Sequence, residues 1–421
     1  MIEAYRGIVP RGVLTEIEAL AGALQGRALC HVNATRSGGG VSELLARLVP
    51  WTQALGIATT WEVLPPAPGF FEVTKALHNA LQGAEVEIPP SDLALYLDAL
   101  RECAPRLRLE GDVVLVHDPQ PAYLIDAPGI DRRRFVWRCH IDLSRPSEAA
   151  WRFLHRAVER YTMAVFHVPQ FARRLAIPEL LIPPSIDPLS EKNRELDDHQ
   201  VTAVTDRFGI DRSRPILVQV SRFDRFKDPL GVIQAFRMVR RSFDCQLVLA
   251  GGGATDDPEG AEVLAEVREA AGADPDIFVL LLPPGSDLEI NALQRAATVV
   301  LQKSIREGFG LTVTEAMWKG RPVIGGAVGG IPSQIVHRRT GFLVHSPEGA
   351  AFRLRYLLTH PRAAQRIGEH AREHVRRNFL VTRHVRDYLL LMLLMLHGRR
   401  DDPIRLPLTE DSAPGGPAAH E

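Results

Sequence analysis

The sequence predicts an α/β protein made of two doubly wound domains, each a parallel β-sheet with helices on both faces. The chain has 421 residues, more than a single hydrophobic core usually spans. Short apolar runs alternate with amphipathic stretches of helical length, which is the pattern of parallel strands joined by helices. This alternation restarts in the second half of the chain, so we expect two sheets in series.

The first half contains the elements of the first sheet. The run "RALCHVN" is apolar enough for a buried strand, and "GVSELLARLVPWTQALG" has apolar residues at helical spacing. "DVVLVHD" and "FVWRCHID" are further strands that end in polar residues. Strands are expected at 27–33, 58–64, 112–118, 135–142 and 161–168, with a helix at 40–56.

The second half repeats the pattern. Strands are expected at 215–224, 245–252, 276–282, 298–304 and 321–327. Residues 194–215 are polar and weakly periodic, so we expect a linker with a short helix and place the boundary near residue 205. The predicted parts are domains at 1–205 and 206–378, a helix at 379–400, and a disordered Pro/Gly/Ala-rich tail at 401–421.

Composition excludes several classes of protein. Lys plus Arg is 50 and Asp plus Glu is 51, so there is no electrostatic footprint for nucleic acid or a membrane surface. The four cysteines are far apart in sequence, which favours free thiols in a cytoplasmic protein, and the N-terminus has no secretion signal. The apolar run "YLLLMLLML" at 388–396 is too short to span a bilayer.

The stretch "LQKSIREGFGLTVTEAMWKG" carries the strongest chemical signal. It places Glu307 in a glycine-rich loop after a buried strand, and Glu315 on the following helix. The first turn of a helix offers free N–H groups and a favourable dipole to an anion. A diphosphate seat flanked by two carboxylates that accept from sugar hydroxyls is therefore expected. Its loop and first turn comprise Gly308, Phe309, Gly310, Leu311 and Thr312.

Two cations follow the first strand of the second half. Arg222 and Lys227 lie in "VSRFDRFKDP", at the same edge of the predicted sheet as Glu307. Arginine offers a planar fork to phosphate and lysine a point charge, so the two could neutralise a diphosphate. A solvated charge cluster with the neighbouring aspartates is the alternative interpretation.

Three glycines, Gly38, Gly39 and Gly40, separate the first strand from the first helix. A phosphate or sugar could approach the backbone there, and a plain tight turn is the alternative. The dinucleotide fingerprint requires a further glycine three positions after its second one, and this loop lacks it. A nicotinamide enzyme is therefore disfavoured.

Polar side chains end two strands of the first half. His117 and Asp118 end one, and His140 and Asp142 end the next, so all four are candidates for sugar contacts. The connection "FFEVTKALHNALQG" holds Lys75 and Asn79 and is either an ordered lid over a sugar or an amphipathic helix packed on the core. No ligand spacing for a metal is present, so no metal site is expected.

Together these motifs resemble the retaining glycosyltransferases of family 4. The resemblance rests on the two glutamates across "GFGLTVT", the Arg222 and Lys227 pair, the triple glycine and the "VGGIP" turn. More narrowly, "HDPQPAYLI", "WRCHIDLS" and "IPPSIDPLSEKN" resemble the glycosyltransferring trehalose synthases. The resemblance spans about residues 8 to 395. It implies the GT-B architecture, with two facing Rossmann-like domains, an interdomain cleft, and a last helix that crosses back to the first domain.

The resemblance also implies roles. Glu307 would hold the donor sugar near C3 and C4, Glu315 the ribose hydroxyls, and Arg222 and Lys227 the diphosphate. His140 would contact the donor sugar near the reacting carbon, and the triple glycine would approach the phosphate. Lys75, Asn79, His117, Asp118 and Asp142 are the candidate acceptor contacts. Ser333 and Gln334 follow "GGIP" where many members carry a glutamate, which leaves that loop's part in donor binding open.

The implied reaction joins glucose from a nucleotide-diphosphate glucose to free glucose, giving α,α-trehalose with retention and in a reversible manner. The nucleotide-glucose is a co-substrate, and no cofactor is needed for the chemistry. Alternatives are a retaining trehalose phosphorylase, another family 4 transferase, or a non-catalytic nucleotide-sugar binding module. The apolar helix at 385–400 would also suit a two-fold contact, so a homodimer is expected.

Overall fold

The computed structural model describes residues 1–421 except 37–39, 66–67, 253–257 and 398–421. The chain divides into two compact units: Met1–Pro183 with the helix that begins at Val381, and Pro184–Leu380. The expected boundary near residue 205 falls inside a helix of the second unit. The reason is that Asn291 Nδ2 donates to the carbonyls of Glu191 and Arg194, at 2.8 and 2.9 Å, and so bonds the start of the expected linker and the segment before it to the second unit.

Within the described residues, the first unit has a six-stranded parallel sheet in the order β2-β1-β3-β4-β5-β6. Its strands are β1 (Ala28–Asn33), β2 (Ala58–Val63), β3 (Val113–His117), β4 (Phe135–Arg138), β5 (Met163–Phe166) and β6 (Glu179–Leu181). β3, β4 and β5 are buried along their whole length. Such continuous apolar strands are typical of a parallel sheet covered on both faces.

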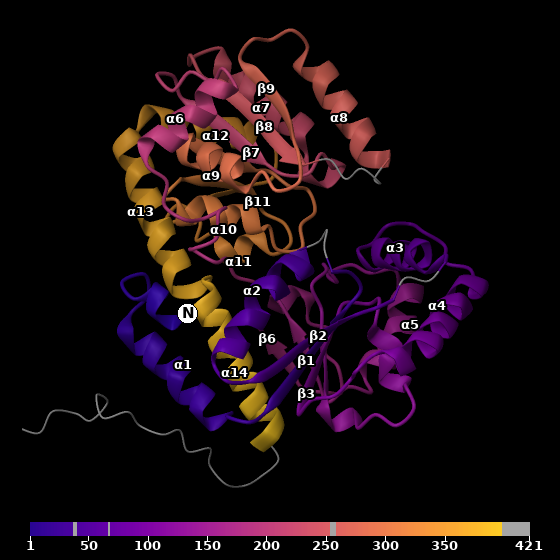
Figure 1. Cartoon of the computed structure of the whole chain (residues 1–421). Helices are drawn as coiled ribbons and strands as arrows, with labels where there is room; N and C mark the ends of the chain where they lie inside the picture. The colour runs from indigo at the N-terminus through magenta and orange to yellow at the C-terminus, as the bar shows by residue number, and fades with distance from the viewer. Residues whose placement is uncertain (37–39, 66–67, 253–257, 398–421) are drawn as a thin grey trace, which may run out of the picture. The chain divides into compact units, whose positions relative to one another are not determined.

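Helices cover both faces of this sheet (Figure 1). They are α1 (Arg11–Ala23), α2 (Gly40–Ala54), α3 (Phe70–Leu81), α4 (Pro90–Cys103), α5 (Glu148–Val158) and α14 (Val381–His397). α3, α4 and α5 pack on the face that holds Cys30, Val116 and Trp137. α14 lies beside α1 and α2 and stacks Tyr388 on His31. Because side chains alternate along a strand, His31 and Cys30 face opposite layers.

The second unit repeats the architecture, with strand order β12-β11-β10-β7-β8-β9 among the residues that the structure describes. Its strands are β7 (Ile216–Val220), β8 (Gln246–Gly252), β9 (Ile277–Leu282), β10 (Val299–Gln302), β11 (Val323–Gly326) and β12 (Phe342–Val344). The sequence order reverses between β10 and β7, which is the switch point where doubly wound sheets bind ligands at the strands' carboxyl ends.

The helices of the second unit are α6 (Asp198–Arg207), α7 (Pro229–Arg240), α8 (Pro258–Ala271), α9 (Asp287–Ala296), α10 (Leu311–Trp318), α11 (Ile331–Gln334), α12 (Pro347–Thr359) and α13 (Pro361–Asn378). α7 lies beside α12, α6 beside α9, and α10 beside α13. The predicted doubly wound parallel fold is thus confirmed in both units.

Every predicted strand is present, and the described residues add two more. β6 and β12 have three residues each and lie at sheet edges, too short to produce a periodic pattern. The four cysteines are free and buried, as predicted. In the described part of the chain, no helix is both long and apolar enough to cross a bilayer.

Candidate active site

Two opposite charges meet where β7 and β10 end. The strands are parallel neighbours, so the turn Arg225–Lys227 and the loop that holds Glu307 leave the same edge. The N–H of Ile305 donates to the carbonyl of Phe226 at 2.8 Å and ties turn to loop. Lys227 Nζ then lies 2.7 Å from both carboxylate oxygens of Glu307. The side chains are 17% and 8% exposed, so this ion pair is largely shielded from water.

Glycines determine the shape of the Glu307 loop. Gly329 has a φ of +55°, and a Cβ there would lie 1.6 Å from the carbonyl oxygen of Glu307. The next residue, Gly330, donates its N–H to Gly308 O at 3.1 Å. Gly310 caps α10 with a φ of +84°. The "VGGIP" turn therefore supports the loop through its backbone, and a side chain at 329 would not fit.

Gln334 holds the same loop through hydrogen bonds from its side chain to the loop backbone. It is fully buried, and its Nε2 donates to Phe309 O at 2.5 Å and to Gly310 O at 3.4 Å. Its Oε1 accepts from the hydroxyl of Thr314. Ser333 bonds within the turn, to Gly330 O at 2.6 Å. Gln334, where the resemblance implies a glutamate in many members, thus supplies an amide that positions the loop backbone.

A second buried ion pair lies beside the first. Lys303 follows β10 and bonds to Asp228, the residue after Lys227. Asp228 has a φ of +51° and caps α7 by accepting from the N–H of Gly231 at 3.1 Å. Its carboxylate thereby holds Lys303 and the start of α7 together. The sequence signal for this cap was an aspartate directly before a proline, because Pro229 favours the first position of a helix and aspartate favours the position before it.

The predicted diphosphate seat is the start of α10. Gly308, Phe309 and Gly310 form the loop, and Leu311 and Thr312 form the first turn. Phe309 is buried and its ring lies 5.8 Å from that of Phe379, so its part is to anchor the loop. The half-buried Thr312 donates to Gln302 Oε1 at 3.1 Å.

Glu315 lies on the buried side of α10. One turn later, Lys319 Nζ donates to Glu315 O at 3.3 Å and to Asn193 Oδ1 at 3.0 Å. Burial lowers the pKa of Lys319 to about 7, against the opposing effect of the Glu315 carboxylate. Trp318 Nε1 donates to Asn193 O at 3.2 Å. Asn193 therefore connects the end of α10 to the first residues of the second unit.

Arg222 and Lys227 follow the same strand but differ in environment. The Arg222 side chain is 62% exposed and its guanidinium lies 3.4 Å from Asp224. The Lys227 ammonium is instead held against Glu307. Of the two predicted phosphate cations, Lys227 is thus the one that the structure pairs with Glu307.

Four histidine rings form a hydrogen-bonded row at the strand ends of the first unit. His31 Nδ1 lies 3.0 Å from His117 Nε2, and His117 Nδ1 lies 2.8 Å from His140 Nε2. His140 Nδ1 lies 3.3 Å from His167 Nε2. Burial lowers the pKa of His31 to about 3 and the pKa values of the other three well below the usual range. Every contact is therefore between neutral rings, one donating and one accepting.

Sequence reasoning placed His117 and His140 here but missed His31 and His167. His31 lies in β1, in "CHVN", and His167 directly follows β5, in "FHVP". Both strands belong to the same parallel sheet as β3 and β4, so a histidine near the carboxyl end of each strand was the available signal. Both ring nitrogens of His140 are engaged in the row, which limits a direct bond from this ring to a sugar.

The two predicted aspartates have different surroundings. Asp118 has a φ of +68° and accepts from the N–H of His140 at 2.6 Å. Burial raises the pKa of Asp118 to about 7. Asp142 accepts from the N–H of Ser144 at 2.8 Å in a local turn. Asp118 thus holds the His140 backbone, while Asp142 stabilises the loop after it.

The segment with Lys75 and Asn79 is helix α3. Of the two structural interpretations, it matches the amphipathic helix packed on the core. Phe70 is buried in the core and Phe71 is 36% exposed. Lys75 is exposed and Asn79 half-buried, one turn apart on one side of the helix. Gly40 is the first residue of α2, and Gly38 and Gly39 lie outside the described residues.

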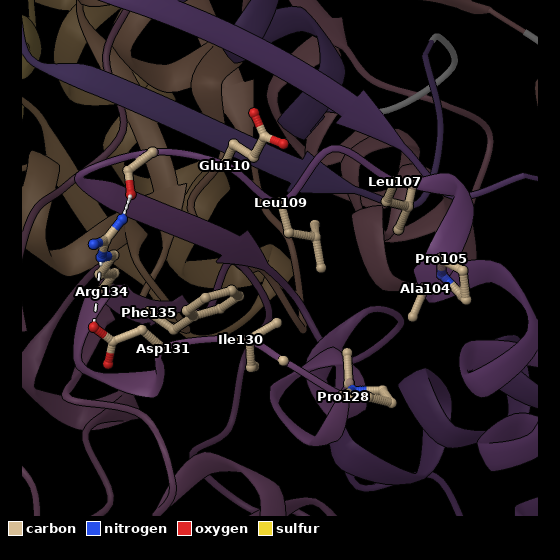
Figure 2. Close-up of a pocket in the computed structure, with 13 residues that line it drawn as sticks. Ala104, Pro105, Leu107, Leu109, Glu110, Pro128, Ile130, Asp131, Arg134 and Phe135 are labelled. Carbon is tan, nitrogen blue, oxygen red and sulfur yellow. Dashed lines mark hydrogen bonds and ion pairs between the residues drawn. The ribbon is translucent and has the colours of Figure 1, made fainter.

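A separate pocket of about 830 Å³ opens in the first unit between the segments that precede β3 and β4 (Figure 2). Arg134, at its rim, donates to Gly111 O at 3.3 Å and lies 3.5 Å from Asp131. It is at the amino ends of the strands, opposite the histidine row. Its charged lining residues are two carboxylates, Glu110 and Asp131, and one cation, Arg134. It therefore offers no excess positive charge to a phosphate, and the strand-end residues are the better candidate site.

Known proteins match this chain along most of its length. The family described as trehalose synthase, N-terminal domain, matches residues 31–173, and the glycosyl transferases group 1 family matches residues 202–374. A trehalose synthase of Pyrococcus horikoshii is 46% identical over 92% of this chain and 95% of that protein. The chain belongs to the trehalose synthase family of glycosyltransferases.

More distant matches to this trehalose synthase family member come from sequence and from solved structures. A trehalose phosphorylase of Pleurotus pulmonarius is 29% identical over 96% of this chain, which spans 62% of that protein. A UDP-forming α,α-trehalose-phosphate synthase of Burkholderia xenovorans, solved with glucose 6-phosphate, has a TM-score of 0.71 at 15% identity, covering 87% of this chain and 100% of that one. The two parallel-sheet domains are those of GT-B glycosyltransferases.

Among the residues that the structure describes, no group of three or more histidine, cysteine, aspartate or glutamate side chains is arranged to hold a metal ion.

Proposed function

We propose that the protein transfers glucose from a nucleotide-diphosphate glucose to free glucose and forms α,α-trehalose. The observation that carries this proposal is the Lys227–Glu307 pair beside the glycine-rich start of α10. It puts a cation, a carboxylate and helix N–H groups at one edge of the second sheet. A nucleotide-sugar needs these same three groups: charge for its diphosphate and acceptors for its hydroxyls.

The proposed reaction proceeds with retention. The bond between glucose C1 and the diphosphate oxygen breaks, while a hydroxyl oxygen of the acceptor bonds to C1 on the same face. The acceptor's proton passes to the leaving phosphate oxygen. Lys227 stabilises the charge that develops there, with Arg222 as the second cation, and Glu307 holds the sugar hydroxyls. Since the leaving group and both centres of trehalose are α, one such displacement accounts for the product and runs in either direction.

We assign the donor to the second unit and the acceptor to the first. Glu315 accepts from the ribose, and the first turn of α10 receives the diphosphate. Lys75, Asn79, His117, Asp118 and Asp142 are the proposed acceptor contacts, and His140 lies nearest to the reacting sugar. Because its ring nitrogens serve the histidine row, we assign His140 a shaping role rather than that of a base.

The test uses purified full-length protein and ¹³C-labelled glucose. It is incubated with UDP-, ADP- or GDP-glucose, and NMR follows α,α-trehalose while an enzyme-coupled assay follows released nucleotide. Equal amounts of labelled trehalose and nucleoside diphosphate are expected with at least one donor, and Glu307→Gln should abolish both. Trehalose formed from maltose alone, without nucleotide, would overturn the proposal.

A trehalose phosphorylase is the second candidate, because a relative of that name aligns with 96% of this chain. The trehalose synthase of Pyrococcus horikoshii is more similar to this chain, at 46% against 29% identity, which favours the synthase. Incubation of trehalose with inorganic phosphate separates the two: a phosphorylase releases glucose 1-phosphate and needs no nucleotide.

A further inference from the structure

A chain of hydrogen bonds runs from the first turn of α10 to the Glu307 carboxylate. Thr312 Oγ1 donates to Gln302 Oε1 at 3.1 Å, and Gln302 Nε2 donates to Ser304 Oγ at 3.0 Å. Ser304 Oγ donates to Glu307 Oε2 at 3.1 Å. The two inner members are 1% and 3% exposed, so water does not compete for these bonds.

The charge of Glu307 determines the direction of every bond in this chain. A carboxylate only accepts, so the hydroxyl of Ser304 must donate to it. The Ser304 oxygen then accepts, which turns the amide nitrogen of Gln302 toward it. The amide oxygen of Gln302 is left facing Thr312, whose hydroxyl must donate in turn. One orientation satisfies all three links.

We infer that Gln302 and Ser304 are positioning residues that hold the Glu307 carboxylate for the donor sugar. Lys227 contacts both oxygens of Glu307 and leaves the rotation of the carboxylate about its axis undefined. The Ser304 bond to Oε2 alone removes that freedom and leaves Oε1 to accept from a sugar hydroxyl. This inference rests on the proposed function.

The chain also determines what Thr312 offers a ligand. Its proton is engaged by Gln302, so its oxygen can only accept. A ligand group at Thr312 is therefore a hydroxyl or another donor, and the phosphates are left to the backbone N–H groups of the helix. The local backbone leaves little room for rearrangement, since a Cβ on Gly326 would lie 2.1 Å from Ser304 O.

The experiment combines Ser304→Ala with Gln302→Met, which removes the amide and keeps the size of the side chain. Each single variant should lower the donor kcat/KM about tenfold, the usual value of one charge-assisted hydrogen bond, while the glucose KM stays within twofold. The double variant should be no more than twofold worse than Ser304→Ala, because Gln302 reaches Glu307 only through Ser304. Losses that multiply, or a donor kcat/KM within twofold of wild type in both single variants, would overturn the inference.

Gln246→Met is the matched control. Gln246 is also a 1% exposed glutamine of the same sheet, at the start of β8, where it bonds to the backbone of Asp211. Gln246→Met should lower the stability of the protein, but it should not lower the donor kcat/KM selectively while the glucose KM stays unchanged. Urea unfolding of the same variants requires no substrate. If wild type makes no trehalose from any nucleotide-glucose, the proposed function fails. The hydrogen-bond chain is then still tested by stability. Losses in the free energy of unfolding of Gln302→Met and Ser304→Ala that are not additive in the double variant support the chain, and additive losses refute it.

Discussion

The ammonium of Lys227 and the carboxylate of Glu307 form one shielded ion pair, with Nζ 2.7 Å from each oxygen. Residues assigned to two adjoining parts of a nucleotide-sugar, its diphosphate and its hexose, are thus in direct contact. A donor that binds there must share this pair. Removal of either residue leaves a buried charge without its partner, which usually costs more than the pair itself contributes.

Lys227→Ala should lower turnover about a hundredfold or more, the effect of losing a main stabiliser of leaving-group charge. Donor affinity should also fall. The exposed cation on the same strand end provides the comparison: Arg222→Ala should have a smaller effect on kcat. Steady-state rates at saturating nucleotide-glucose decide this, and wild-type turnover in Lys227→Ala would show that the lysine does not have this role.

Gly329→Ala should inactivate the protein through the backbone. The new Cβ would lie 1.6 Å from Glu307 O at a φ of +55°, so the Glu307 loop must move, at a cost of about 3 kcal/mol or more. Gly209 also has a positive φ, +69°, but a Cβ there would meet no atom within 4 Å. Gly209→Ala should cost about 1–2 kcal/mol and keep activity. Urea unfolding and a transfer assay on both variants test this, and equal losses would argue against backbone overlap.

Acid should destabilise the first unit. The pKa values of His31, His117, His140, His167 and His384 are all lowered, mainly by burial. A group with a depressed folded-state pKa is protonated more readily in the unfolded chain. Stability is therefore full above about pH 6.5 and falls with acid, by about 1.4 kcal/mol per pH unit for each proton taken up.

Asp118 acts in the opposite direction. Burial raises its pKa to about 7, so its contribution is present at low pH and is lost as the pH rises through 7. One such group opposes five histidines, so the net effect is loss of stability below about pH 6.5. Hydrogen exchange of β1, β3 and β4 peptides, corrected for intrinsic rates, should show faster opening at about pH 5.5 than at about pH 7. Unchanged protection would contradict the burial of these rings as neutral groups.

Sequence patterns located the strand ends but not which of their side chains would meet. Glu307 and Lys227 could be placed at one edge because parallel strands end together, yet their contact depends on the Ile305–Phe226 backbone bond between two loops. The histidine row likewise depends on sheet order: β1, β3, β4 and β5 are adjacent, which spacing along the chain does not state. Gln302 and Ser304 follow the apolar run 299–301, and a buried network of polar side chains there leaves no periodic signal.

Lys75 and Asn79 remain the predicted acceptor contacts. They lie one turn apart on α3, one exposed and one half-buried. Replacing both with alanine should raise the glucose KM far more than the donor KM. Arg101→Ala, an exposed helix residue paired with Asp98 in the same unit, should change neither. A trehalose complex with α3 more than about 10 Å from the sugar, beyond one bridging water, would remove this assignment.

The last prediction concerns assembly through α14. Most apolar side chains of this helix are buried within the first unit, but Leu390 and Leu394 are 42% and 39% exposed. They lie four residues apart, so they form one short apolar ridge, which suits a two-fold contact with a second copy. We predict a dimer at micromolar concentration, and Leu390→Glu with Leu394→Glu should dissociate it because charges would then face each other across the axis. Phe352, which is 62% exposed on α12, offers a control, since Phe352→Glu should leave the dimer intact. Sedimentation velocity tests all three proteins, and a single 46.6 kDa species for wild type would exclude the dimer without affecting the assignment of the active site.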